Sequence, residues 1–237
     1  MRGKLYGVGI GPGDPELITL KARRILSQVA TVAVPKTAAE KDSLALSIAG
    51  EAVEEGKEVL ELLFPMTQNP LQLQESWEEG TTAIRQRLDQ GKDVAFITLG
   101  DPTVYSTYLY LHHRIREEGY DTEIIPGVTS FCASAALLGL GLGENRESIA
   151  VIPSVYECEN LVDVLQHFET IVLMKVSKSL PRLKALLQQE GLLEKSVLVV
   201  RCGLEGQQVV HDWGSRQDES VSYFSTMIVK KSGVSLP

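Results

Sequence analysis

The sequence predicts an α/β protein of two domains, the first with a mostly parallel sheet and the second with a mixed sheet. Short apolar runs alternate with helical stripes through residues 1–125. Pro126-Gly127 then interrupts the chain directly after an apolar run. Near the end of the chain, two strand-like runs follow each other with no helix between them. We therefore expect an N-terminal domain of residues 1–125 and a C-terminal domain of residues 126–237.

The first domain opens with an apolar strand at residues 4–10 that runs into a loop of glycine and proline. Asp14-Pro15 is expected to begin a helix, because Asp is a favoured N-cap and Pro suits the first helical turn. Pro35 is expected to stop the second strand, and Ser43 to cap a second helix that Gly56 ends. The later elements keep the same alternation, with strands at residues 57–63, 93–99 and 122–125 and apolar helical stripes over 73–88 and 104–115. This alternation predicts parallel strands covered by helices on both faces.

The second domain has a different order of elements. Its first strands are expected at residues 149–152, 170–175 and 197–201, with helices between them. The last two, at residues 207–213 and 222–229, follow without an intervening helix. Strands joined in that way pair antiparallel, so we expect a mixed sheet.

Composition excludes several classes of function. The net charge of −8 argues against nucleic acid as a partner, because binding phosphates requires a basic face. No apolar run reaches the roughly 18 residues that cross a bilayer, and the first residues lack the pattern of a signal peptide, so we expect a cytoplasmic protein. Cys132, Cys158 and Cys202 are too scattered for a disulfide framework or a zinc site, and we expect reduced thiols in or near the core.

Three glycine-bearing loops are the candidate ligand site: residues 9–14, 99–102 and 126–130. Each follows an apolar strand, and ligands of open α/β sheets bind just beyond the carboxyl ends of strands. Glycine is also used where backbone must approach a ligand closely. The alternative is that all three are simply tight turns. The first loop fails the dinucleotide fingerprint, because Asp14 stands where the last glycine belongs, and no phosphate-binding Gly-Lys-Ser/Thr occurs.

Asp101 is the carboxylate held inside the second of these loops. It either binds hydroxyls or an amine of a cofactor, or it caps the helix that follows, and the spacing leaves both readings open. His112 and His113 are neighbours in a helix and point about 100° apart, so they cannot share a metal ion. We expect them to be surface or helix-packing residues and predict no metal site.

The ordered segments Val8–Leu17, Thr98–Thr107 and Ile125–Ser130, together with the ending at 223–231, resemble the signatures of the tetrapyrrole (corrin/porphyrin) methyltransferases. The resemblance covers essentially the whole chain. Finer features resemble the C20 branch of that family, which methylates precorrin-2 or its cobalt-loaded counterpart, cobalt-factor II, in cobalamin synthesis: residues 34–36, residues 64–67 and Trp77. Val34-Pro35 replaces a Tyr-Asp pair of the uroporphyrinogen-methylating branch, so the base assigned to that Asp is not carried over.

The resemblance implies a bilobal α/β homodimer that binds S-adenosylmethionine in a cleft between its lobes and releases S-adenosylhomocysteine. The positions matching the family's cofactor contacts are Pro12, Leu99, Gly100, Asp101, Val104, Tyr105, Thr129, Ser130, Met174, Gly203 and Leu204. After the strand at 170–175 the register is ambiguous, and Met174 is favoured over Lys175.

The implied substrate is an anionic tetrapyrrole. Lys36, Lys21 and Arg24 are tentative candidates for gripping its carboxylates. Arg201 is a weaker one, because a structural ion pair would equally explain it. No catalytic residue is identified, since a sulfonium is already a strong electrophile and catalysis needs mainly positioning in a dry site. The alternatives are methylation at another ring position, or a non-catalytic module that binds a nucleotide or metabolite.

Overall fold

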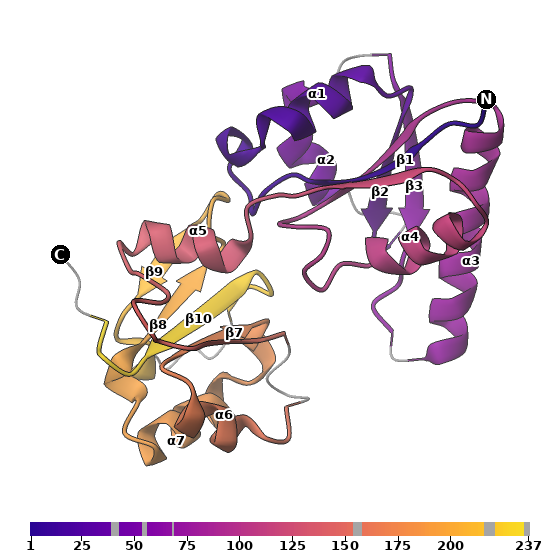
Figure 1. Cartoon of the computed structure of the whole chain (residues 1–237). Helices are drawn as coiled ribbons and strands as arrows, with labels where there is room; N and C mark the ends of the chain where they lie inside the picture. Colours follow the sequence, from indigo (N-terminus) through magenta and orange to yellow (C-terminus); the bar gives the residue numbers. More distant parts are fainter. Residues whose placement is uncertain (39–42, 54–55, 68, 154–157, 216–220, 235–237) are drawn as a thin grey trace. The chain divides into compact units, whose positions relative to one another are not determined.

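The computed structural model divides the chain into two compact units, residues 1–129 and residues 130–237 (Figure 1). It describes residues 1–237 except 39–42, 54–55, 68, 154–157, 216–220 and 235–237. The sequence assigns residues 126–129 to the second domain. In the structure they lie with the first unit, because Gly127 packs directly against Gly9.

The first unit is built on a parallel sheet of five strands in the order β3-β2-β4-β1-β5. The strands are β1 (Leu5–Gly9), β2 (Thr31–Lys36), β3 (Glu58–Leu63), β4 (Val94–Thr98) and β5 (Thr122–Ile125). Every pairing is parallel, which confirms the prediction. Since β1 lies between β4 and β5, the loops that follow these three strands leave the same edge of the sheet side by side.

Helices cover both faces of this sheet (Figure 1). The helices are α1 (Leu20–Gln28), α2 (Leu44–Ala49), α3 (Pro70–Asp89) and α4 (Tyr108–Glu117). Right-handed crossovers place α1 and α2 on one face and α3 and α4 on the other. Against the second face, Ile84 and Leu88 of α3 and Leu111 and Ile115 of α4 form a fully buried core with Phe96 of β4.

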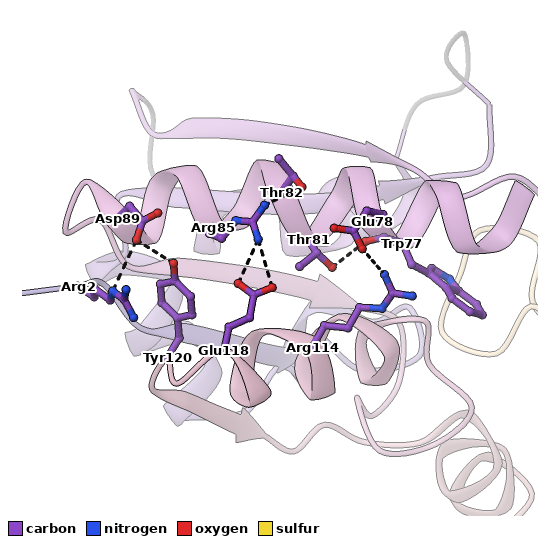
Figure 2. Close-up of polar contacts among 10 residues, drawn as sticks. All are labelled: Arg2, Trp77, Glu78, Thr81, Thr82, Arg85, Asp89, Arg114, Glu118 and Tyr120. Carbon is purple, nitrogen blue, oxygen red and sulfur yellow. Dashed lines mark hydrogen bonds and ion pairs between the residues drawn. The ribbon is translucent and has the colours of Figure 1, made fainter. Parts of the chain in front are cut away.

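Ion pairs line the contact between α3 and α4 (Figure 2). Arg114 bonds Glu78 at 2.8 Å, and Arg85 bonds Glu118 at 3.2 Å. Half-exposed pairs of this kind contribute little free energy, about 0–1 kcal/mol each, so apolar packing holds the two helices together and the pairs set their alignment. The result is a fixed α4, whose first turn follows the loop at residues 99–107.

Several boundaries differ from the prediction. Val104 lies in the loop before α4, and the last strand begins at Ser225 and not at residue 222. Three other differences have a local cause. Asp14 caps only a 3₁₀ turn (η1, Pro15–Leu17), and α1 begins at Leu20 under a cap by Thr19. Pro35 does not stop β2, because beyond Ala33 this strand pairs only with β3 and needs no N–H toward β4. The second helix ends at Ala49 and is followed by the 3₁₀ turn η2 (Gly50–Ala52), so the assignment of its end to Gly56 is wrong.

The second unit has a five-stranded mixed sheet in the order β6-β7-β10-β8-β9. Its strands are β6 (Ile149–Ile152), β7 (Thr170–Met174), β8 (Ser196–Val200), β9 (Gln208–Val210) and β10 (Ser225–Lys230). β10 is antiparallel to both of its neighbours, and β9 is antiparallel to β8, which confirms the predicted mixed sheet. Because β10 reverses direction, β7 and β8 run the same way and end at the same edge.

Alternating residues of β8 face two separate cores, as a pleated strand buried on both sides requires. Leu198 and Val200 join the core under α6 (Leu161–His167) and α7 (Leu180–Gln189). Val197 and Val199 join the core under α5 (Ser130–Leu137). Short 3₁₀ turns complete the unit: η4 (Val176–Lys178), η5 (Leu193–Lys195) and η6 (Trp213–Ser215). Within the described residues of both units, no helix combines the length and apolarity that a bilayer crossing requires.

Candidate functional site

The three glycine-bearing loops of the first unit meet at the carboxyl edge of its sheet. Gly11 and Gly100 form a two-way backbone bridge, in which Gly100 N–H donates to the Gly11 carbonyl at 2.7 Å and Gly11 N–H donates back at 3.4 Å. The loop after β5 joins them through Gly127. The convergence expected from the sequence is therefore present in the structure.

Close backbone contact at this meeting point requires glycine. A Cβ on Gly127 would lie 2.2 Å from the Gly100 carbonyl oxygen, and one on Gly9 would lie 2.6 Å from the same oxygen. Neither distance is possible for a real side chain. Gly100 itself has φ +68, and a Cβ there would meet no atom closer than 3.9 Å, so space remains on its open side. Gly9 and Gly127 are therefore needed for the loops to pack together, whereas Gly100 has free space beside its Cα.

Asp101 links the loops after β4 and β5. Its side chain is buried, with Oδ1 accepting from the Thr103 N–H at 2.7 Å and Oδ2 accepting from the Gly127 N–H at 2.9 Å. Both oxygens are thus used inside the protein. The helix-capping reading fails, because α4 begins only at Tyr108. The cofactor-binding reading stays a prediction, since a carboxylate oxygen can accept more than one hydrogen bond. Asp101 therefore holds two loops in register, a role that the sequence did not indicate.

The other predicted positions of the first unit lie on the same loops. Pro12 is buried after β1, whereas Leu99, Val104 and Thr129 are half-buried after β4 and β5. Tyr105 is 52% exposed and has φ 51, a left-handed backbone that costs a non-glycine residue roughly 1–2 kcal/mol. Strained residues of this kind are typical of ligand sites.

The remaining predicted cofactor positions lie on the second unit. Ser130 is the first residue of α5. Met174 ends β7, and Gly203 and Leu204 follow β8, so these three share the edge where both strands end. The Leu204 N–H donates to the Arg201 carbonyl at 2.9 Å, which closes a tight turn there. The two groups of positions are each brought together within their own unit, and the cleft between the domains stays a prediction.

The tentative substrate residues are mostly paired with acids. Lys36 ends β2 and bonds Glu61 at 3.1 Å. Lys21 bonds Glu123 at 2.6 Å, and Lys4 bonds the same carboxyl group. Hydrogen bonds from Lys21 and then Lys4 lower the pKa of Glu123 to about 2. Lys21 is therefore part of a structural cluster.

Arg24 and Arg201 differ from these lysines. Arg24 is exposed on α1. Arg201 makes no ion pair with any carboxylate among the residues that the structure describes, and its Nε donates instead to the Glu205 carbonyl at 2.6 Å. The structural ion pair considered for Arg201 is thus not found in the described part of the chain.

The structure also places two histidines and the cysteines considered from the sequence. His112 is buried and its Nδ1 lies 3.1 Å from the Tyr108 hydroxyl, as expected for a helix-packing residue. Burial lowers the pKa of His112, and the neighbouring His113 adds to this. Burial raises the pKa of the Cys202 thiol. Cys132 is exposed, so the expectation that all three cysteines lie in or near the core is wrong for it.

Gly9 and Gly127 are the site residues that the sequence analysis passed over, although both lie within its three loops. Their importance comes from contacts between loops about 30, 90 and 120 residues apart, which a local pattern does not reveal. The one local signal was a glycine at or just beyond the end of each strand. The loops they shape present carbonyl and amide groups with small side chains and no lysine or arginine between residues 9 and 14 or between 99 and 105.

A family model described as Tetrapyrrole (Corrin/Porphyrin) Methylases matches residues 4–213. The cobalt-precorrin-2 C(20)-methyltransferase of Salmonella typhimurium is 40% identical over 98% of both chains. The probable cobalt-precorrin-2 C(20)-methyltransferase of Methanocaldococcus jannaschii is 36% identical over 96% of both.

Solved structures agree with these sequence relatives. A cobalt precorrin-4 methyltransferase has a TM-score of 0.75 and 26% identity, covering 98% of this chain and 96% of that one. Uroporphyrin-III C-methyl transferase from Thermus thermophilus, complexed with S-adenyl homocysteine, has a TM-score of 0.70 at 22% identity, covering 97% and 98%, and shows the same fold. From the near-complete match to the family model and to relatives of similar length, the chain belongs to the tetrapyrrole (corrin/porphyrin) methylases.

Proposed function

We propose that this protein transfers a methyl group from S-adenosylmethionine to C20 of precorrin-2, in its cobalt-bearing form, during cobalamin biosynthesis. The observation that carries the site is the closure of three loops around Gly9, Gly100 and Gly127. The ring position follows from the C(20) relatives, which match nearly the full length of the chain. Both are named for cobalt-precorrin-2, which favours the cobalt-bearing substrate over metal-free precorrin-2.

The loops of the first unit fit the cofactor through shape. Gly100 has free space beside its Cα, and Pro12, Leu99, Val104 and Thr129 lie on the same three loops with buried or half-buried side chains. These residues, with Tyr105 and Ser130 and with Met174, Gly203 and Leu204 of the second unit, would hold the cofactor, which supplies a methyl group on a positively charged sulfur. Asp101 supports these residues, because it accepts hydrogen bonds from Thr103 and Gly127 and so keeps the two loops in place.

The protein's contribution to the reaction is orientation and exclusion of water. Holding two reactants in line can lower a barrier by roughly 7–11 kcal/mol in favourable cases. The loops are suited to this, because the Gly11–Gly100 bridge and the Asp101–Gly127 bond leave them little freedom. A rigid, mostly apolar site also keeps water from competing with the attacking carbon. The methyl transfer itself breaks the carbon–sulfur bond of the cofactor and needs no acid. The C20 proton must then leave to a base, so that the tetrapyrrole gains one methylene group.

Among the tentative substrate residues of the first unit, Lys36 is the best placed to bind a carboxylate of the substrate. It ends β2 at the same sheet edge as the three loops, whereas Lys21 is committed to Glu123. An incoming substrate carboxylate would compete with Glu61, whose side chain is 58% exposed, for the Lys36 ammonium. Arg24 is retained as the weaker candidate. We also propose a cytoplasmic homodimer, which light scattering in solution would test.

The test uses purified protein with S-adenosylmethionine and cobalt-precorrin-2. We expect the tetrapyrrole to gain the mass of one methylene group, with the new methyl located on C20 by carbon-13 labelling. Calorimetry should show binding of S-adenosylhomocysteine and none of ATP or NAD. Metal-free precorrin-2 serves as the comparison substrate. A methyl found at another ring carbon, or no transfer to either tetrapyrrole while S-adenosylhomocysteine binds, would overturn the assignment.

A further inference from the structure

Two basic residues stand at equivalent positions on one edge of the second unit. Lys175 follows β7 and Arg201 follows β8, the two strands that flank β10. Both have a left-handed backbone, with φ 54 at each. This conformation is strained for a side chain larger than that of glycine. Such strain persists where the surroundings enforce it, most often at ligand sites and switches.

Neither cation is neutralised by a carboxylate within the residues that the structure describes. The Lys175 ammonium lies 5.9 Å from the centre of the Tyr223 ring. The Arg201 Nε donates to a backbone carbonyl, and among the described residues no carboxylate bonds the rest of its guanidinium group. By contrast, Lys21, Lys36 and Lys230 are all paired with glutamates.

Exposed aromatic surface accompanies these two cations. Tyr223 and Phe224 precede β10 and are 41% and 38% exposed. Their rings meet edge to face with centroids 5.5 Å apart. The Arg201 N–H donates to the Phe224 carbonyl at 2.7 Å, which fixes this segment against the end of β8. The edge therefore combines flat apolar groups with positive charge.

The register of the sheet fixes the spacing of the two bases. Met174 and Val199 both pair with Thr226 of β10. Lys175 and Arg201 are thus two strands apart, a backbone separation of about 10 Å. Long, flexible side chains from such positions can grip two acidic groups at the rim of one large ligand, but not a single small anion without bending toward each other.

We propose that Lys175 and Arg201 anchor two peripheral carboxylates of the tetrapyrrole, with Tyr223 and Phe224 against its apolar ring system. The inference rests on the proposed function and names substrate contacts that lie on the second unit. Arginine suits this role because its planar fork matches a carboxylate, and lysine adds a mobile point charge. These two residues, rather than Lys21, supply the charge that recognises the substrate.

The experiment compares Lys175→Met, Arg201→Met and the double variant with the wild-type enzyme. The matched controls are Lys178→Met and Arg182→Met, which remove the same charges from exposed positions nearby. We expect KM for cobalt-precorrin-2 to rise about tenfold in each single variant and about a hundredfold in the double variant, as loss of charged hydrogen bonds predicts. The controls should stay near the wild-type KM.

Two further measurements separate recognition from structure. Affinity for S-adenosylhomocysteine should be unchanged in every variant, and added salt should raise KM of the wild type more than that of the double variant. Lys175→Arg and Arg201→Lys keep the charges and should keep most of the substrate affinity. These milder variants also serve if the double variant does not fold.

The outcomes are distinguishable from a failure of the proposed function. If the wild type transfers no methyl group to the tetrapyrrole, the proposed function is wrong. If the wild type is active but the methionine variants keep its KM, the anchoring role alone is wrong. A parallel loss of S-adenosylhomocysteine affinity would also overturn it, because the residues would then be shaping the cofactor site instead.

Discussion

Replacing Gly127 by Ala should damage the loop junction more than its small size suggests. The new methyl group would lie 2.2 Å from the Gly100 carbonyl oxygen and 2.9 Å from two backbone atoms of Gly9. A normal contact is near 3.4 Å, so the overlap is about 1 Å against atoms of the main chain. Those atoms cannot yield without breaking the Gly11–Gly100 bridge.

The expected cost follows from that overlap. Overpacking typically costs 1–3 kcal/mol, and a clash with backbone belongs at the upper end, about 3 kcal/mol. For a unit of this size, that loss lowers Tm by about 10 °C. Affinity for S-adenosylhomocysteine should fall at least about tenfold, because the three loops can no longer close. Gly119→Ala is the matched control: its φ is +81, but nothing lies within 4 Å of the added methyl, so only the strain of about 1 kcal/mol applies.

Thermal unfolding followed by tryptophan fluorescence tests the prediction. The chain has two tryptophans, Trp77 in the first unit and Trp213 in the second. A Trp213→Phe background therefore reports the first unit alone. Calorimetry with S-adenosylhomocysteine is run well below both transitions. If Gly127→Ala costs no more than Gly119→Ala and binds the ligand normally, the contact at the junction does not have the importance assigned to it.

Three other substitutions test single interactions. Asp101→Asn replaces the carboxylate oxygen that accepts the Gly127 N–H with an amide NH₂ or with a weaker amide oxygen. The loss should lower the unfolding free energy by about 1–3 kcal/mol. It should also weaken S-adenosylhomocysteine binding in calorimetry. Glu123→Gln should cost about 1 kcal/mol at neutral pH in urea melts, a figure reduced for the partial exposure of the pair. Because the pKa of Glu123 is lowered from 4.5 to about 2, that difference should shrink as the pH falls through this window. Lys230→Met should lower the unfolding free energy by about 3 kcal/mol, because it removes a 4% exposed side chain whose ammonium pairs with two glutamates. The control Lys231→Met should lower it by less than about 1 kcal/mol.

Each of these has a contrary result that is easy to recognise. Wild-type stability of Asp101→Asn would mean that the loop after β5 is held by other contacts. A pH-independent gap for Glu123→Gln would assign its effect to packing. Equal losses in the two lysine variants would remove the special role of the buried ammonium, whose pKa is lowered by burial but raised overall by its bonds to Glu147 and Glu144.

The sheets were predictable because their signals are local and repeated. Alternating apolar runs and helical stripes predicted the parallel sheet, and the missing helix between the last two strands predicted a mixed sheet. Those two strands, β9 and β10, do not pair with each other, because β8 lies between them. The meeting of the three loops followed from a general property of parallel strands, whose carboxyl ends share an edge. The family resemblance added the cofactor positions, which no periodicity contains.

The failures have physical causes. Asp14-Pro15 is as good a start for a 3₁₀ turn as for an α-helix, and the extended backbone at Ile18 and Thr19 separates the two. The bond from Gly127 to Asp101 joins residues 26 apart in sequence, so no short motif announces it. The left-handed backbone of Lys175 is hidden as well, because glycine and asparagine are the usual signs of that conformation.

The central position of β10 has a consequence for biosynthesis. In the first unit the middle strand, β4, is also translated after both of its neighbours, β1 and β2, although it is not the last strand of that sheet. In the second unit the middle strand is translated after β7 and β8, which until then have apolar edges with no neighbour between them. Those two edges are open to pairing with other nascent chains during that interval. Because β10 is the last strand of its sheet in sequence order, the sheet of the second unit is completed only after all of its other strands have been translated.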